Sequence, residues 1–263
     1  MGFSILLTGF TRFGATILYR VQSLGHFTTF FFKSTLYILP LSVSKIVSQI
    51  YFIGAKSMLV VCLTGAFTGM VLGFQGYYTL SQFGAEGYLG SLVALSLVRE
   101  LGPVLSAMMI IARAGSAMTA EIGIMRISDQ IDALKTMNIQ PIRFLVTPRI
   151  VAALISFPLL ASLCNVIGIL GGYATGSLLL GINGATYFNR VASSIQMNDV
   201  VESLIKAIVF GVVTITICCY QGYYTHRNND FGAKGVSLST TRAVVVSCVL
   251  VLVMDYVLTS FLM

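Results

Sequence analysis

Residues 57–85 read SMLVVCLTGAFTGMVLGFQGYYTLSQFGA, a stretch without a single Asp, Glu, Lys, Arg or His. A run of about 18 or more such residues is long enough to cross a bilayer as a helix. Two further stretches, 150–189 and 243–254, also lack all five of these residue types. The sequence therefore predicts an integral membrane protein, for which the length rules of soluble domains do not apply.

The overall composition supports this reading. Hydrophobic residues make up 56% of the 263 positions and charged residues only 10%, whereas a soluble domain carries about 25% charged residues. The net charge is +7, but the basic residues are distributed as at membrane boundaries, so we exclude nucleic acid as a partner. The five cysteines lie in apolar segments without a CxxC or a Cys/His cluster, and no metal site is predicted.

The apolar segments predict an all-α membrane protein with five spans, numbered here in chain order: 57–80, 88–112, 150–178, 203–224 and 243–263. With these spans, 13 Lys and Arg residues lie on the side of the N-terminus, and only Arg190 lies on the other side. Because basic residues collect on the cytoplasmic side, we expect a cytoplasmic N-terminus and a C-terminus outside.

The N-terminal segment, residues 1–40, mixes Phe, Leu and Ile with widely spaced basic residues. This pattern predicts a helix that lies in the membrane interface. A first spanning helix is the alternative for the same segment.

The sequence contains neither an ATP-binding loop nor a hydrolytic site. No GxxxxGK[ST] motif occurs, and the two histidines, His26 and His226, each lie near a membrane boundary and belong to no Ser/His/Asp set. We therefore predict no catalytic residue and no cofactor bound by this chain.

Small residues recur every four positions in two of the predicted spans: Gly65, Gly69 and Gly73 in the first, and Gly168, Gly172 and Gly176 in the third. Such a stripe lets another backbone approach closely. Packing within one chain is one interpretation. A homodimer interface or the border of a substrate cavity is the other.

Four charged residues fall inside the predicted spans: Arg99, Glu100, Lys206 and Asp255. Each costs about 3 kcal/mol at the centre of a membrane helix, so each is expected to face protein or water. Counted at about 1.5 Å per residue, Lys206 and Asp255 both lie in the outer half of the membrane. We therefore predict that these two form a buried charge pair.

Arg99 and Glu100 pose a different problem, because they are adjacent in the stretch LSLVRELGPV (95–104). Neighbouring residues on a helix do not face each other. Pro103 has no N–H to bond the carbonyl four residues back, which belongs to Arg99. The stretch is either a structural polar knot or the border of a wet cavity that accommodates an amphiphile.

The connection between spans two and three contains ARAGSAMTAEIGIMRISDQIDALKTMNIQP (112–141). Ile127, Ile131 and Leu134 repeat at helical spacing with polar residues on the other faces, which predicts a short amphipathic helix over 120–137. This helix lies on the membrane surface or serves as a lever for a separate ATPase.

The sequence resembles the MlaE-type (YrbE-like) permeases of the ABC systems that move phospholipid between the two membranes of Gram-negative bacteria. Four blocks carry the resemblance: GAFTGMVLGFQGY (65–77), LVALSLVRELGPVL (92–105), ARAGSAMTAEIGIMRISDQIDAL (112–134) and MDYVLTSFL (254–262). It covers essentially the whole chain, so we expect a single permease domain over 1–263.

The resemblance implies a homodimer in the bacterial inner membrane, with an interfacial helix and five spans in each copy. It also implies a cytoplasmic ABC ATPase, which binds ATP and Mg, a STAS-domain protein bound to that ATPase, and a periplasmic hexamer of MCE-domain subunits. The helix at 120–137 would be the coupling helix that docks on the ATPase.

The same resemblance implies two sets of site residues in this sequence. The lipid cavity would lie at the dimer centre and be lined by Leu72, Thr79, Leu80, Phe83, Arg99, Glu100 and Leu101. Coupling to the ATPase would use Glu121, Arg126, Asp129, Gln130, Ile131 and Leu134. Relatives with Glu-Gln in the coupling helix differ from Asp129-Gln130 here, which keeps the charge on a shorter side chain.

Three functions remain open on the sequence alone: a phospholipid permease, an ion- or proton-coupled carrier that uses the four buried charges, and a membrane anchor without transport. A relay would use buried acids, but it does not explain an amphipathic cytoplasmic helix. The direction of transport and the preferred headgroup do not follow from the sequence.

Overall fold

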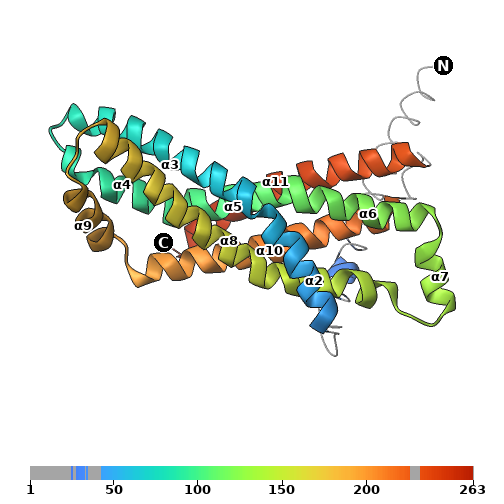
Figure 1. Ribbon diagram of the computed structural model, residues 1–263. Helices are drawn as coiled ribbons and strands as arrows, with labels where there is room; N and C mark the ends of the chain where they lie inside the picture. The colour runs from blue at the N-terminus through green and yellow to red at the C-terminus, as the bar shows by residue number, and fades with distance from the viewer. Residues whose placement is uncertain (1–24, 26–27, 33, 35–42, 226–231, 263) are drawn as a thin grey trace, which may run out of the picture.

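The computed structural model describes residues 25, 28–32, 34, 43–225 and 232–262, which form an elongated bundle of helices (Figure 1). No strand occurs in this described part. The α-helices are α2 (Val43–Ile53), α3 (Met58–Ser81), α4 (Leu89–Ser96), α5 (Gly102–Ile110), α6 (Ser116–Ile127), α7 (Gln130–Thr136), α8 (Thr147–Tyr173), α9 (Gly184–Ser194), α10 (Met197–Tyr223) and α11 (Ala233–Leu262).

Short segments of other helix types join these helices. The 3₁₀ segments are η1 (Ala55–Ser57) and η2 (Glu86–Tyr88). The π-helical segments are η3 (Leu97–Leu101), η4 (Ile111–Gly115), η5 (Ile142–Val146) and η6 (Ala174–Leu179).

Five helical rods of the described chain are long and apolar enough to cross a membrane: Val43–Ser81, Glu86–Ile127, Ile142–Leu179, Met197–Tyr223 and Ala233–Leu262. The prediction of an all-α membrane protein with five spans is therefore confirmed. Each rod begins or ends beyond the predicted bounds, because a helix continues past the hydrocarbon layer as long as its hydrogen bonds do. The α7 turn lies at one end of the bundle and α9 at the other (Figure 1).

The two glycine stripes pack against each other within one chain. A Cβ added at Gly69 would lie 1.8 Å from the carbonyl oxygen of Gly168, and one at Gly73 would lie 3.1 Å from that of Gly172. Glycine is required here because the backbones of α3 and α8 approach too closely for a side chain. The structure thus supports the interpretation of these stripes as packing within the chain.

Two sequence predictions need comment. The single helix expected over 120–137 is wrong: residues up to Ile127 continue span two as α6, and α7 begins only at Gln130. The chain turns at Asp129, whose φ of 54° lies in the left-handed region, where Asp is tolerated better than most residues. The interfacial helix predicted for 1–40 lies almost wholly outside the described residues.

Candidate functional site

A network of charged side chains joins spans two, four and five, with Lys206 at its centre. The Lys206 ammonium lies 2.9 Å from Oε1 of Glu100 and 3.4 Å from Oδ1 of Asp255. Its side chain is only 2% exposed. Three elements therefore meet at one buried cation: η3 supplies Glu100, α10 supplies Lys206 and α11 supplies Asp255.

Lys206 also satisfies the backbone beside Pro103. Its Nζ donates to the carbonyl oxygen of Arg99 at 2.9 Å, which is the carbonyl that the proline ring leaves without a helical partner. The π-helical segment η3 widens the helix at this point, as such bulges often do at functional sites. The break in span two and the buried lysine are thus two parts of one arrangement.

Arg99 pairs with a residue that the sequence reasoning missed. Its Nε donates to Oδ1 of Asp199 at 2.8 Å. The other oxygen of Asp199 accepts the backbone N–H of Gln196 at 2.9 Å, which closes a capping box at the start of α10. Gln196-x-x-Asp199 departs from the usual Ser/Thr-x-x-Glu/Gln pattern of a capping box, so the sequence carried no standard signal for this helix start.

Thr259 is the second member that was missed. It accepts a hydrogen bond from Lys206 Nζ at 2.7 Å and lies 3.1 Å from Oε1 of Glu100. Its position one turn after Asp255 on α11 places both on the same helix face. Together, Arg99, Glu100, Asp199, Lys206, Asp255 and Thr259 are called the charge network below.

The charge network is buried on one side and accessible on the other. Lys206 and Asp199 are almost fully buried, whereas the side chains of Arg99 and Glu100 are 36% and 35% exposed. Buried charges with several partners hold helices in one register, since removing any partner leaves an uncompensated charge. The two partly exposed charges are the groups that an amphiphilic ligand beside span two would meet.

The remaining residues assigned to the lipid cavity lie in two environments. Leu72, Leu80 and Leu101 are partly buried against a core cluster between α4, η3 and α9. Thr79 and Phe83 are exposed at the end of α3, and Phe83 is 79% exposed. Within one chain, these side chains therefore do not line a common cavity: three lie against a packed core and two are exposed near the end of α3.

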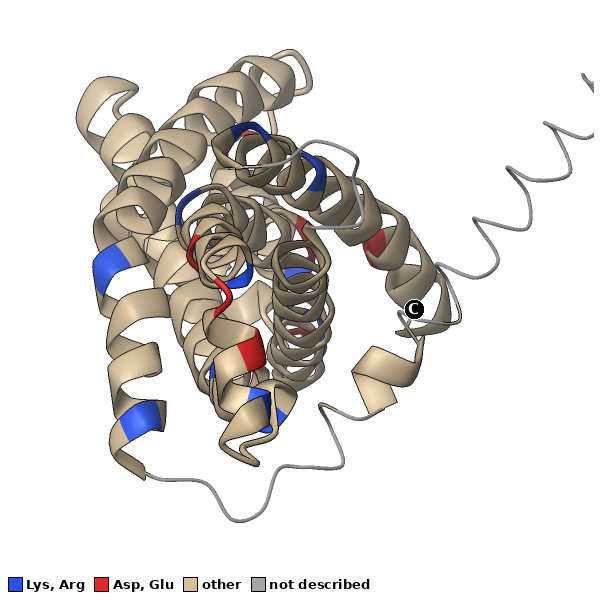
Figure 2. Cartoon of the chain, turned by 90° about the vertical axis from the view of Figure 1, so that its right-hand side faces the viewer, with Lys and Arg blue, Asp and Glu red and all other residues tan. Residues whose placement is uncertain are grey.

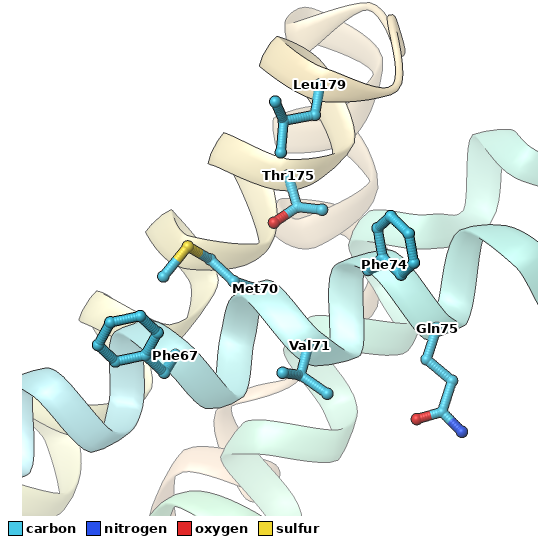
Figure 3. A pocket seen from close by; sticks show the side chains of 7 residues that line it. All are labelled: Phe67, Met70, Val71, Phe74, Gln75, Thr175 and Leu179. Atoms are coloured by element: carbon cyan, nitrogen blue, oxygen red, sulfur yellow. The ribbon is translucent and has the colours of Figure 1, made fainter.

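A groove of about 510 Å³ lies between α3 and η6 (Figure 3). It is lined by Phe67, Met70, Val71, Phe74, Gln75, Thr175 and Leu179. None of the residues predicted for the lipid cavity lines it. Its apolar walls lie along the outside of span one, where hydrocarbon chains of the membrane are the natural neighbours.

The end of the bundle opposite α9 carries a second set of ion pairs. Figure 2 views the molecule from the α7 end, with charged positions in colour on a mostly uncharged bundle. Asp132 of α7 lies 2.9 Å from Nη1 of Arg126 and 2.7 Å from Nζ of Lys135. Lys135, followed by Arg126, lowers the pKa of the Asp132 carboxyl from its ordinary value.

The rest of the predicted coupling residues surround these pairs. Ile131 is fully buried and Leu134 partly buried against the main core, while Asp129 and Gln130 are exposed. Helix α7 therefore fixes one apolar face to the bundle and presents a polar face outward.

Glu121 has a structural partner of its own. Nη2 of Arg149, at the start of α8, donates to Oε2 of Glu121 at 2.8 Å. The Arg149 side chain is 4% exposed, whereas that of Glu121 is 54% exposed. This pair ties the end of span two to the start of span three, next to the turn that leads into α7.

Comparison with known proteins gives a consistent result. The family described as "Permease MlaE" matches residues 46–261. A probable ABC transporter permease protein of Rickettsia conorii is 43% identical over 91% of this chain and 92% of its own length. The intermembrane phospholipid transport system permease protein MlaE of Haemophilus influenzae is 40% identical over 82% of each chain. The chloroplastic protein TRIGALACTOSYLDIACYLGLYCEROL 1 of Arabidopsis thaliana is 35% identical over 79% of this chain and 58% of its own.

Proposed function

The chain belongs to the MlaE permease family and is an ABC transporter permease, and from this premise we propose that it moves phospholipid between the inner and outer membranes of a bacterium. The name of the Haemophilus relative supports this substrate. The sequence has no ATP-binding loop, so a separate ATPase, with its ATP and Mg, would supply the energy.

The observation that carries the proposal is the exposed polar face of α7 at one end of the bundle. The side chains of Asp129, just before α7, and Gln130, its first residue, are exposed, whereas Ile131 is fully buried. A short helix that is anchored by one apolar side chain and exposes its polar face is suited to transmit a movement from a docked partner. The Arg126–Asp132 pair connects α7 to span two, and the Glu121–Arg149 pair joins the end of span two to the start of span three.

The proposal extends to the assembly. Spans one and five bury the smallest shares of their apolar windows, 28% and 11%, which leaves apolar faces for lipid and for a second copy of the chain. A homodimer would place its lipid cavity beside Arg99 and Glu100. We further propose a STAS-domain protein on the ATPase and a periplasmic hexamer of MCE-domain subunits, with the N-terminus in the cytoplasm and the C-terminus in the periplasm.

The test is reconstitution of the permease with its ATPase in liposomes that contain a fluorescent phospholipid. The paired substitution Asp129→Asn and Gln130→Ala should abolish ATP-driven lipid movement while the thermal midpoint of the permease stays unchanged. Asn is chosen because it tolerates the left-handed backbone at this position. Ser193→Ala, an exposed change on α9 at the opposite end, is the matched control and should transport normally.

The outcomes separate the alternatives. Full lipid movement by the α7 variant would overturn coupling through this helix. Lipid or solute movement that follows an ion gradient and ignores ATP would favour the ion- or proton-coupled carrier, which would use Arg99, Glu100, Lys206 and Asp255. If the ATPase binds this chain but no lipid moves on addition of ATP, the chain is a membrane anchor.

A further inference from the structure

The chain changes direction between α2 and α3. Helix α2 ends at Ile53, η1 follows, and α3 starts at Met58, so that α2 leaves the line of α3 at an angle (Figure 1). Gly54 lies at the break, where a Cβ would come within 2.8 Å of the Ile50 carbonyl oxygen. The break places Lys56 directly before the uncharged run 57–85, at the boundary of the hydrocarbon layer.

Two cations converge on one aromatic ring at this break. Nζ of Lys56 lies 5.6 Å from the ring centroid of Phe52, and the guanidinium carbon of Arg113 lies 4.8 Å from the same centroid. Arg113 comes from the π-helical segment η4 of span two and donates from Nη1 to the Phe52 carbonyl. The ring therefore brings together a lysine from span one and an arginine from span two.

Neither cation is neutralised by a carboxylate in the described part of the chain. The ion pairs found there use Arg99, Arg126, Lys135, Arg149 and Lys206 as their cations. Lys56 is exposed and Arg113 is partly buried. Arg113 has five N–H donors, and among the described residues only the hydrogen bond to the Phe52 carbonyl uses one of them. Two uncompensated cations at the edge of an apolar layer form a site for an anion.

The position of this pair sets it apart from the charge network. Arg113 follows Arg99 by 14 positions on the same rod, which corresponds to roughly 20 Å along a helix. Exposed apolar side chains of α2 lie beside the pair, and Tyr51, whose ring is 5.6 Å from Lys56 Nζ, is 61% exposed. An anion bound here would therefore have hydrocarbon next to it, as a lipid phosphate has.

We propose that Lys56 and Arg113 bind the phosphate of an anionic phospholipid in the leaflet at the α7 end of the bundle. Arginine offers a planar fork that matches phosphate oxygens, and lysine adds a mobile point charge. The bound lipid would fix the angle between α2 and α3. This site is separate from the charge network and does not depend on which substrate the permease moves.

Native mass spectrometry of the purified protein tests the proposal, with phosphatidylglycerol as the lipid probe and inorganic phosphate as the competitor. Lys56→Gln should weaken phosphatidylglycerol binding about fivefold, since a cation near an anionic surface has an effect of this size. Lys56→Arg should retain the lipid. Arg190→Gln, at the opposite end of the bundle, is the matched control and should bind as the wild type does.

Three results would overturn the assignment. The first is equal phosphatidylglycerol binding by the wild type and Lys56→Gln. The second is an equal loss of binding in the Arg190→Gln control. The third is displacement of the lipid by inorganic phosphate at comparable concentration, which would assign the site to free phosphate. Arg113→Lys keeps a donor for the Phe52 carbonyl, so it supplies a second folded variant, and it should also weaken lipid binding.

Discussion

The charge network and the ion pairs around α7 use the same bonds in different surroundings. The Lys206–Glu100 and Arg126–Asp132 distances are both 2.9 Å. The Lys206 and Glu100 side chains are 2% and 35% exposed, whereas those of Arg126 and Asp132 are 14% and 47% exposed and that of Lys135 is 49% exposed. Bond length therefore does not separate the two regions, but burial does.

This difference in burial indicates that the two regions have different roles. A buried ion with several partners is costly to disturb, because the remaining charges lose their compensation. An exposed pair contributes little, since water and salt replace it. We therefore expect the charge network to hold spans two, four and five in register, and the proposed coupling to a partner to act through the exposed face of α7.

Substitution of the central lysine should have the largest effect. Lys206→Met leaves Glu100 and Asp255 close together without their cation, and we expect a loss of about 3–5 kcal/mol in unfolding free energy. The thermal unfolding midpoint of the detergent-purified protein measures this. A midpoint equal to that of the wild type would contradict the structural role of the network.

Asp199→Asn should have the next largest effect. It weakens the bond to Arg99 and the cap on the Gln196 N–H, and together these correspond to about 1–3 kcal/mol. Thermal unfolding again provides the measurement. Asp199→Glu is the control for charge alone, and recovery of the full midpoint by Glu would show that the cap geometry contributes nothing.

Glu121→Gln is expected to cost less, about 1 kcal/mol, because the Gln amide oxygen still offers an acceptor to the buried Arg149 guanidinium and water reaches the half-exposed side chain. A double-mutant cycle with Arg149→Met measures the coupling of the pair. A coupling energy as large as that between Lys206 and Glu100 would show that exposure does not set the ranking proposed here.

The smallest effect is expected at Asp132, where the thermal midpoint should not change in Asp132→Asn. The pKa of Asp132 is lowered in the folded protein, so its contribution to the local stability of α7, as distinct from the global unfolding midpoint, is present above the unfolded pKa and disappears as the pH falls through the lowered value. Hydrogen exchange of the amides in 130–136 should therefore accelerate on acidification. Exchange that is independent of pH, after correction for intrinsic rates, would exclude this contribution.

Much of the fold followed from the sequence, because uncharged runs identify spans directly. The consequence of Pro103 was also visible, since a missing N–H has a defined position in the helix. The partner of that carbonyl was not, because the contact between Lys206 and Arg99 joins residues 107 positions apart. Sequence spacing within one helix carries no information on such contacts.

The prediction of one continuous helix over 120–137 failed for a local reason. Apolar residues at helical spacing run through Ile127 and Ile131, so periodicity alone favours one continuous helix. The break depends on the left-handed backbone of Asp129, a conformation that Asp adopts only in some contexts. The partners Asp199 and Thr259 were overlooked because only charges inside the predicted spans were considered.

One paired measurement tests most directly whether the charge network stabilises the fold while the residues at the start of α7 serve transport. Thermal stability and ATP-driven lipid movement should be measured on the same reconstituted preparations of Lys206→Met and of the Asp129→Asn, Gln130→Ala variant. We predict that Lys206→Met lowers the unfolding midpoint, whereas the α7 variant keeps the wild-type midpoint and loses lipid movement. An α7 variant that retains both properties, or a Lys206→Met protein as stable as the wild type, would contradict the account.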